Sequence, residues 1–222
     1  MAIKFNPFTG EFYKDSSGNV DTNELNSAVS DALDARDLSV DAVVAEGFEA
    51  GGHNGREETT TFTLIPMVNK AIDIPLIAAG GVGNGQAMLA AMILGADAVQ
   101  VGTRFVASLE ASSHINFKHK VLEIKEGETQ LTLKELAPVR MIKNKFYQDI
   151  QSLYQQSPSK EDLKKLLGRA RAKKGMFEGN LDEGELEIGQ ISGLIDELLP
   201  AQTIVKQMIK EYGEAKASIC QE

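Results

Sequence analysis

The chain has 222 residues, of which 42% are hydrophobic and 25% charged, which is the balance of a globular protein with a full core. Its net charge of −9 argues against nonspecific binding to nucleic acid, which needs clustered lysine and arginine. The single cysteine, Cys220, excludes an internal disulfide framework and a cysteine-rich metal site. No apolar run approaches the ~20 residues of a membrane span, and no secretory signal is visible. We therefore expect a cytoplasmic protein with no membrane or nucleic-acid partner.

The first 40 residues are predicted to form a leader without a strand. Residues 1–20 are rich in turn-forming types, including Asn6-Pro7 and Thr9-Gly10, and indicate a loop or an extension. A capping-box spacing begins at Asp21, and apolar residues follow at helical intervals, which predicts a helix over residues 22–36. The leader is thus a loop followed by one helix.

Three short apolar runs come next, and glycine follows each of them. They cover residues 42–45, 76–79 and 98–101, and each is predicted to be a buried strand. Between them lie a helical pattern from Leu64 to Ile72, with Pro66 acceptable only in the first turn, and a helix over 85–94 capped by Asn84. Alternating strands and helices predict consecutive βα units of a parallel sheet or barrel, over residues 41–107.

The remainder, residues 108–222, is predicted to be a mostly helical subdomain. A helical pattern runs from Val139 to Ile150, and residues 159–174 form a basic amphipathic helix. Further helices are expected at about 188–198 and 201–217, with one strand at 130–133 and a loop rich in glycine and glutamate over 175–189. The predicted fold class is therefore α/β.

The glycines after the second and third strands form a candidate phosphate site. Gly80-Gly81 and Gly102-Thr103 end neighbouring strands, so their backbone N–H groups lie side by side, and Thr103 adds a hydroxyl. Loops after the last strands of a (β/α)₈ barrel often bind phosphate. The alternative is that these are only tight turns.

His53 is the candidate general base. Gly52 and Gly55 flank it, which argues against burial in a packed core and places the imidazole at the mouth of a site. The alternative is a structural histidine. Glu46 and Gln100 end their strands, where they could bind a ring or ribityl group or only close loop hydrogen bonds. The isolated pair His53 and Glu57 does not suffice for a metal site.

Three motifs in this order resemble the nitronate monooxygenase family, which is FMN-dependent, folds as a TIM barrel and includes the flavin-dependent enoyl-ACP reductases. The motifs are EAGGH at Glu49–His53, AAGGV at Ala78–Val82 and VQVGTRF at Val99–Phe105. The resemblance extends from Asp41 to Tyr212. Within it, Glu183–Leu194 is similar to the family's C-terminal loop over the flavin.

The resemblance implies that His53 is the active-site histidine. It implies an FMN site made of Glu46, Gly51, Gly52, Gly80, Gly81, Gln100, Val101, Gly102 and Thr103. The activity implied is oxidation of alkyl nitronates with O₂, in which His53 abstracts an α-proton or orients the nitro group. In the other branch, FMN passes hydride from NAD(P)H to an enoyl thioester. The partner in both branches is a small-molecule substrate.

The family's N-terminal half has no counterpart in residues 1–40, and this departure limits the resemblance. Eight βα units need ~200 residues or more, whereas three are predicted here. The chain is therefore interpreted as the last three βα units of a TIM-type (β/α)₈ barrel, in a fragment, split gene product or fusion. An N-terminal barrel half is then the expected partner, and a catalytically silent fragment is the alternative to an enzyme.

Overall fold

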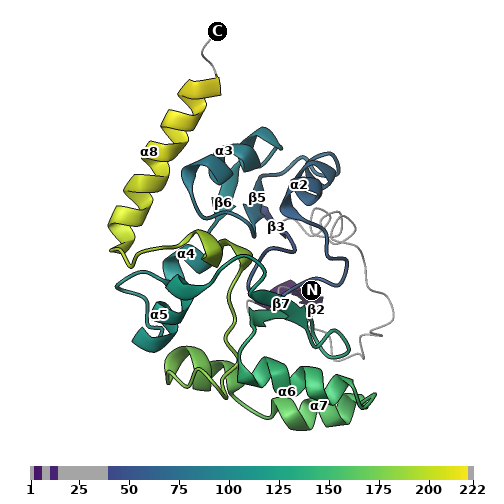
Figure 1. The fold of residues 1–222 in the computed structure, drawn as a ribbon. Coiled ribbons are helices and arrows are strands. Elements are labelled where there is room, and N and C mark those ends of the chain that lie inside the picture. Colours follow the sequence, from purple (N-terminus) through teal and green to yellow (C-terminus); the bar gives the residue numbers. More distant parts are fainter. Residues whose placement is uncertain (1–2, 7–10, 15–39, 220–222) are drawn as a thin grey trace.

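The computed structural model describes residues 3–6, 11–14 and 40–219 (Figure 1). The helix predicted over 22–36 and Cys220 lie outside these residues. Strands β1 (Ile3–Asn6) and β2 (Glu11–Lys14) pair antiparallel, with Ile3 opposite Lys14. The prediction of a loop there was wrong: Ile3–Asn6 alternates apolar and polar residues at the period of a strand, and Glu11–Lys14 carries two aromatic residues, which favour strands, but the turn-forming residues around both segments masked these signals.

The three predicted buried strands form one parallel sheet. They are β3 (Val43–Glu46), β5 (Leu76–Ala79) and β6 (Ala98–Gln100), in the order β3-β5-β6. Val43 lies opposite Leu76, and Ile77 lies opposite Ala98. This confirms the predicted strands to within one residue at each end, and their carboxyl ends meet at one edge of the sheet. The prediction that all three are buried was wrong for β6, whose Ala98 and Gln100 are exposed at the edge of the sheet.

Helices α2 (Thr61–Asn69) and α3 (Gly85–Ile93) follow β4 (Gly52–His53) and β5 in the chain and lie beside the parallel sheet (Figure 1). Asn84 caps α3 as predicted, since its side chain accepts a hydrogen bond from the Ala87 N–H at 2.8 Å. Pro66 lies inside α2 rather than in its first turn. The reason is that α2 begins at Thr61, before the apolar pattern that the sequence shows.

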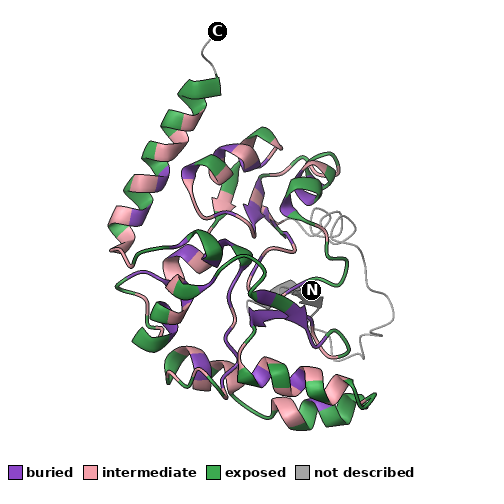
Figure 2. Cartoon of the chain, in the orientation of Figure 1, coloured by how far each residue is buried: buried purple, intermediate pink, exposed green. Residues whose placement is uncertain are grey.

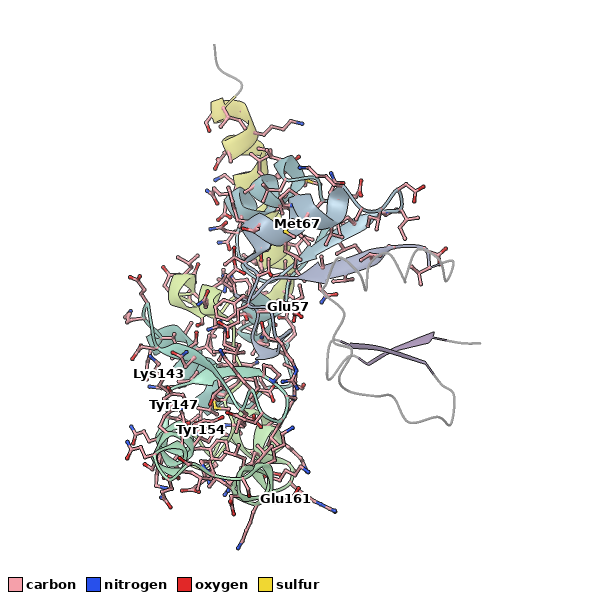
Figure 3. All side chains as sticks on the ribbon, turned by 90° about the vertical axis from the view of Figure 1, so that its right-hand side faces the viewer. Glu57, Met67, Lys143, Tyr147, Tyr154 and Glu161 are labelled. Carbon is pink, nitrogen blue, oxygen red and sulfur yellow. The ribbon has the colours of Figure 1, made fainter. Side chains whose placement is uncertain are left out.

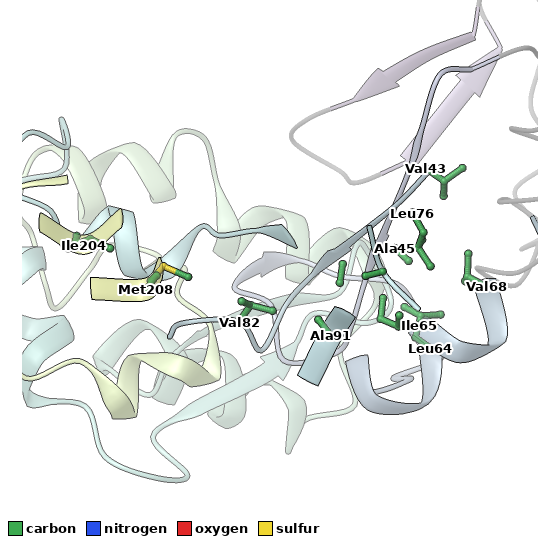
Figure 4. Packing of buried hydrophobic residues seen from close by; sticks show 12 residues of the cluster. Val43, Ala45, Leu64, Ile65, Val68, Leu76, Val82, Ala91, Ile204 and Met208 are labelled. Atoms are coloured by element: carbon green, nitrogen blue, oxygen red, sulfur yellow. The ribbon is translucent and has the colours of Figure 1, made fainter. Parts of the chain in front are cut away.

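The core of this layer is aliphatic and joins the sheet to three helices (Figure 4). Val43, Leu76 and Ala78 from the strands pack with Leu64 and Ile65 from α2. The long helix α8 (Ala201–Ile219) lies against α3 (Figure 1). It adds Ile204 and Met208, which are 1% and 7% exposed. The last helix of the chain therefore packs on the same core as the parallel sheet.

A second, antiparallel sheet lies beside the parallel one. It consists of β4 (Gly52–His53), β8 (Val139–Ile142) and β7 (Thr129–Thr132), in the order β4-β8-β7. The strand at 130–133 was predicted one residue late, and 139–142 was wrongly predicted to be helical. All four residues of β8 are buried, so their sequence shows no alternation that would identify a strand.

The remaining elements of the described residues are helices. They are α4 (Thr103–Val106), α5 (Ile115–Glu123), α6 (Lys145–Tyr154), α7 (Lys160–Leu167), the π-helix η1 (Lys173–Phe177) and the 3₁₀-helix η2 (Gln190–Leu194). Figure 3 shows Tyr147, Tyr154 and Glu161 of this part far from Met67 of α2. Buried residues gather in β5, β7 and β8, and exposed ones cover the outer sides of α6, α7 and α8 (Figure 2).

Three predictions in this part need correction. The helix predicted over 159–174 ends at Leu167, because Gly168 has φ +65°, which an α-helix does not continue. The helix predicted over 188–198 is only η2, and the loop predicted from Gly175 begins inside η1. Among the described residues, no helix is both long and apolar enough to cross a membrane.

Candidate functional site

A cavity of about 250 Å³ opens at the carboxyl ends of the three parallel strands. Seven of the residues predicted for the site line it: Glu46, Gly51, Gly80, Gly81, Gln100, Gly102 and Thr103. The rest of the wall comes from Glu49, Ala50, Ala79, Val82, Val106, Met176, Glu187, Ile188 and Ile191. The wall is therefore partly apolar, partly backbone and partly carboxylate, and it contains no lysine or arginine among the described residues.

Glycines after β5 and β6 leave backbone without side chains on this part of the cavity wall. Gly80 and Gly81 have φ +79° and +71°, which side-chain-bearing residues rarely adopt. A Cβ on Gly80 would lie 2.6 Å from the Gly47 carbonyl oxygen, whereas a Cβ on Gly102 would meet nothing within 4 Å. Packing therefore requires glycine at position 80, whereas Gly102 leaves open space at the cavity. This open glycine wall fits an anionic group held by backbone N–H donors.

The segment from Glu187 to Ile191 closes one side of the cavity. The Gly189 N–H donates to Thr103 Oγ1 at 3.0 Å, and the Gln190 N–H donates to the Glu49 carbonyl at 2.9 Å. A Cβ on Gly51 would lie 2.3 Å from the Gly189 nitrogen, so the two backbones are in direct contact. The fold therefore brings this segment, about 140 residues after the EAGGH motif, against the glycines of that motif.

Arg140 of β8 holds the loop that carries the EAGGH motif. Its side chain is 1% exposed, and Nε and Nη2 donate to the Phe48 carbonyl at 3.1 and 2.8 Å. The guanidinium also lies 4.4 Å from the centre of the Phe48 ring, a cation–π contact. Burial lowers the pKa of Arg140, and the nearby Glu49 carboxylate opposes that shift. Arg140 thus anchors the loop through Phe48.

The Glu49 carboxylate is hydrogen-bonded to Thr61, the first residue of α2. It accepts hydrogen bonds from the Thr61 N–H at 2.9 Å and from the Thr61 hydroxyl at 3.0 Å. A carboxylate at a helix N-terminus is stabilised by the unpaired N–H groups and the helix dipole. Glu49 therefore fixes the loop to α2, although one side of it faces the cavity beside Gly81.

Two other carboxyl groups of the wall have strongly perturbed acidity. Burial raises the pKa of Glu187 from 4.5 to about 7. Glu46 presents surface to solvent, but loss of water around its carboxyl raises its pKa to about 7 as well. Behind them, burial and then the charge of Glu187 raise the pKa of Glu185 to about 7, and Arg171 opposes this. Groups with such pKa values exchange protons near neutral pH.

The other predicted site residues lie outside the cavity wall. His53 is half-buried in β4, opposite Val139, and Gly52 precedes it opposite Arg140. Val101 packs against the aliphatic core of the parallel layer. None of the three is among the residues that line the cavity in the part of the chain that the structure describes. Within that part there is also no cluster of three or more histidine, cysteine, aspartate or glutamate residues able to hold a metal ion.

Sequence reasoning did not single out Glu187, Glu49 or Arg140 for the site. Glu187 stands in the segment compared with the family's flavin loop, and alternating glutamates at 183, 185 and 187 are a visible signal there. Glu49 begins the EAGGH motif. Arg140 is a charged residue inside an apolar run, which could have marked it as buried with a partner.

The sequence of the chain is similar to those of known proteins. The nitronate monooxygenase family model matches residues 9–211, which includes part of the leader and so begins earlier than the resemblance at Asp41. A probable nitronate monooxygenase of Staphylococcus saprophyticus is 30% identical over 198 residues, covering 85% of this chain and 55% of the relative. One from Bacillus subtilis is 31% identical over 193 residues, with 83% and 55% covered. The chain spans about half the length of these relatives.

Solved structures show the same fold. FabK from Thermotoga maritima is 38% identical with a TM-score of 0.81, covering 86% of this chain and 60% of FabK. The nitroalkane oxidase of Streptomyces ansochromogenes is 30% identical with a TM-score of 0.71, covering 86% and 57%. An enoyl reductase domain of MlnA from Bacillus amyloliquefaciens, 16% identical with a TM-score of 0.60, shares the fold. Because the family model matches most of its residues, this chain belongs to the nitronate monooxygenase family.

Proposed function

We propose that this chain binds FMN and serves in the oxidation of alkyl nitronates with O₂. The observation that carries the proposal is the cavity itself, in which the glycine turns after β5 and β6 face the segment from Glu187 to Ile191. Membership of the nitronate monooxygenase family supports the reaction type. When bound, FMN supplies the electron transfer, and the protein supplies binding and orientation.

The residues present suit the parts of FMN. Backbone N–H groups at Gly81 and at Gly102–Thr103 would hold the phosphate, and Val82, Ile188 and Ile191 would pack against the ring. Gln100 would hydrogen-bond the ribityl chain or the ring edge. The cavity of about 250 Å³ is smaller than the ~300–1,000 Å³ of most ligand sites, so it receives only part of the flavin. We propose that an N-terminal barrel half completes the wall.

His53 is proposed to act on the substrate from the rim of the cavity. It lies in β4 next to Gly52, where a Cβ would come within 2.8 Å of a carboxylate oxygen of the wall residue Glu187. From this position it orients the nitro group or accepts an α-proton. Replacing His53 with Asn should leave FMN bound but slow turnover. An equal loss on the neutral nitroalkane and on the preformed nitronate would assign it to orientation.

The enoyl-ACP reductase branch is the second candidate. The observations that favour it are the identity with FabK, 38% against 30% for nitroalkane oxidase, and the fold shared with an enoyl reductase domain. In that branch the same cavity would hold FMN beside an enoyl thioester. A catalytically silent chain that only binds the phosphate end of a ligand is the third alternative.

Flavin titration and two activity assays separate these candidates. The chain is titrated with FMN alone and after mixing with the N-terminal half of a family member, and binding is followed by flavin fluorescence. We expect weak binding alone and tighter binding in the mixture. O₂ consumption with a nitronate supports the first function, and NADH oxidation with an enoyl thioester supports the second. A protein that stays colourless in both settings would contradict the FMN proposal.

A further inference from the structure

We propose that Asn144 positions one side of the cavity wall, although Asn144 is not among the residues that line the cavity. Its side-chain amide binds the segment from Leu181 to Gly184, and this segment leads directly into the wall from Glu187 to Ile191. The inference rests on the proposed function for the identity of the ligand, which is FMN. Asn144 is therefore a positioning residue, which acts through the backbone of the wall.

The amide of Asn144 makes hydrogen bonds in two directions. Its Oδ1 accepts from the Tyr147 N–H at 3.1 Å and so caps the first turn of α6. Its Nδ2 donates to the Leu181 and Gly184 carbonyls at 2.7 and 2.8 Å, with a longer bond of 3.3 Å to the Asp182 carbonyl. Serine or aspartate could also cap the helix, but among the preferred capping residues only asparagine adds two N–H donors. The residue type thus serves both the helix and the segment.

The segment from Leu181 to Gly184 is held along its whole length. Besides the bonds from Asn144, the Asp182 carbonyl accepts from the Phe146 N–H at 2.9 Å. Arg171 Nη1 donates to the Glu183 carbonyl at 2.8 Å. Four consecutive carbonyls therefore accept hydrogen bonds from residues elsewhere in the chain. Gly184 is buried, so its carbonyl would lose free energy if the donor from Asn144 were removed.

A short buried stretch connects this segment to the cavity wall. Glu185 and Leu186 are buried, and the Ile142 N–H donates to the Leu186 carbonyl at 2.9 Å. Glu187, which follows, forms an antiparallel bridge with Met141 and lines the cavity. The end of β8 and the residue just after it thus bind the segment on both sides of Glu185. A displacement of the segment would be passed on to the wall, because the connecting residues are packed.

The same segment also supports a second part of the wall, the π-helix η1. A Cβ on Gly184 would lie 2.1 Å from the Gly175 Cα, so the two backbones are in direct contact. The next residue of η1 is Met176, which lines the cavity. A π-helix is rare and frequently occurs at a functional site. Asn144 is therefore connected to the cavity through Met176 as well as through the segment from Glu187 to Ile191.

Hydrogen–deuterium exchange of backbone amides tests the role of Asn144 without any ligand. Asn144→Ser keeps an oxygen for the cap of α6 and removes the amide donors. We expect the Gly189 and Gln190 amides of the wall to exchange about 10–100-fold faster in this variant, because each lost hydrogen bond lowers the cost of local opening. FMN affinity, titrated by fluorescence with the N-terminal half of a family member, should fall about tenfold or more. Asn144→Asp, which keeps the side-chain shape without the donors, should show the same two effects.

Ser159→Ala is the matched control, because Ser159 caps α7, the helix that packs on α6, by accepting from the Asp162 N–H at 3.3 Å. Amides of α7 should exchange faster, while exchange at the wall and FMN affinity should stay within about threefold of wild type. Wall amides at the wild-type rate in both Asn144 variants, equal acceleration in Ser159→Ala, or unchanged FMN affinity despite faster exchange would overturn the proposal. Faster exchange at the wall of Asn144→Ser, together with a wild-type chain that binds no FMN, would uphold the positioning of the wall and refute the proposed function.

Discussion

The two sheets of this molecule serve the site in different ways. The parallel strands β3, β5 and β6 end at the cavity and supply the turns that line it. The antiparallel sheet instead joins distant segments, since Arg140 of β8 holds the carbonyl of Phe48, 92 residues earlier. It also pairs with the segment that carries Glu187. The parallel sheet thus presents the backbone that lines the cavity, and the antiparallel sheet keeps the two halves of the wall together.

Replacing Arg140 is expected to have the largest effect on stability, because it removes the contacts by which β8 holds the loop at Phe48. Arg140→Met leaves the half-buried Phe48 carbonyl without the two N–H groups of Arg140 that donate to it and removes the cation–π contact. We expect the free energy of unfolding to fall by about 3–4 kcal/mol, measured by urea denaturation. Arg56→Met is the control, because exposed Arg56 also donates to two carbonyls, those of Lys134 and Leu136. Arg56→Met should lower the free energy of unfolding by less than about 1 kcal/mol. Equal losses of stability in the two variants would contradict the anchoring role of Arg140.

The buried acid Glu185 predicts a stability that depends on pH. Its pKa is about 7 in the folded chain and 4.5 as the ordinary value, so the folded state binds its proton more tightly. Stability from this group is therefore full below pH 4.5 and is lost as the pH rises to 7. Glu185→Gln should raise the free energy of unfolding by up to about 3 kcal/mol at pH 8 and by little at pH 4. Urea titrations at both pH values measure this, and a gain that does not change with pH would refute the shift.

Changes at the glycine turn test the parallel layer with little effect on the fold. Gly81→Asp places a carboxylate at the expected phosphate position and should weaken FMN binding at least tenfold by fluorescence titration. It should also lower the free energy of unfolding by about 1–2 kcal/mol, because position 81 has φ +71°, which residues with a side chain rarely adopt. Gly127→Asp is the matched control, since Gly127 has φ +77° and lies outside the cavity. It should show a similar loss of stability with unchanged FMN affinity. Equal affinities in the two variants would remove Gly81 from the phosphate site.

The smallest expected effect on stability is at Gly102. A Cβ there meets nothing within 4 Å, and its φ of −101° suits any residue, so Gly102→Ala should change the free energy of unfolding by less than about 0.5 kcal/mol. FMN affinity should nevertheless fall, because the methyl group enters the space proposed for the phosphate. Thermal melting and flavin titration measure the two quantities. A stable protein with full FMN affinity would place the phosphate elsewhere.

Much of the parallel layer could be predicted from the sequence. Each strand is a short apolar run followed by glycine, and Asn84 caps α3 at the predicted place. These signals are local, because an apolar run ended by glycine and a capping side chain can both be recognised within a short segment of the chain. Strand β8 could not be predicted in this way. It is uniformly buried, and although β7 pairs with it from a few residues away, its other partners, Gly52 and His53, lie far away in the sequence.

The sequence by itself determined the three glycine-ended strands, the helices between them and the glycines that line the cavity, because propensity and periodicity are properties of short segments. Only the tertiary structure decided which carboxyls enter that cavity and which groups hold it together. Glu187 and Arg140 acquire their roles from burial beside Gly52 and Phe48, residues about 90 or more positions away. Burial of a charged group and the shift of its pKa depend on the residues packed around it, and a short segment of sequence does not specify those residues.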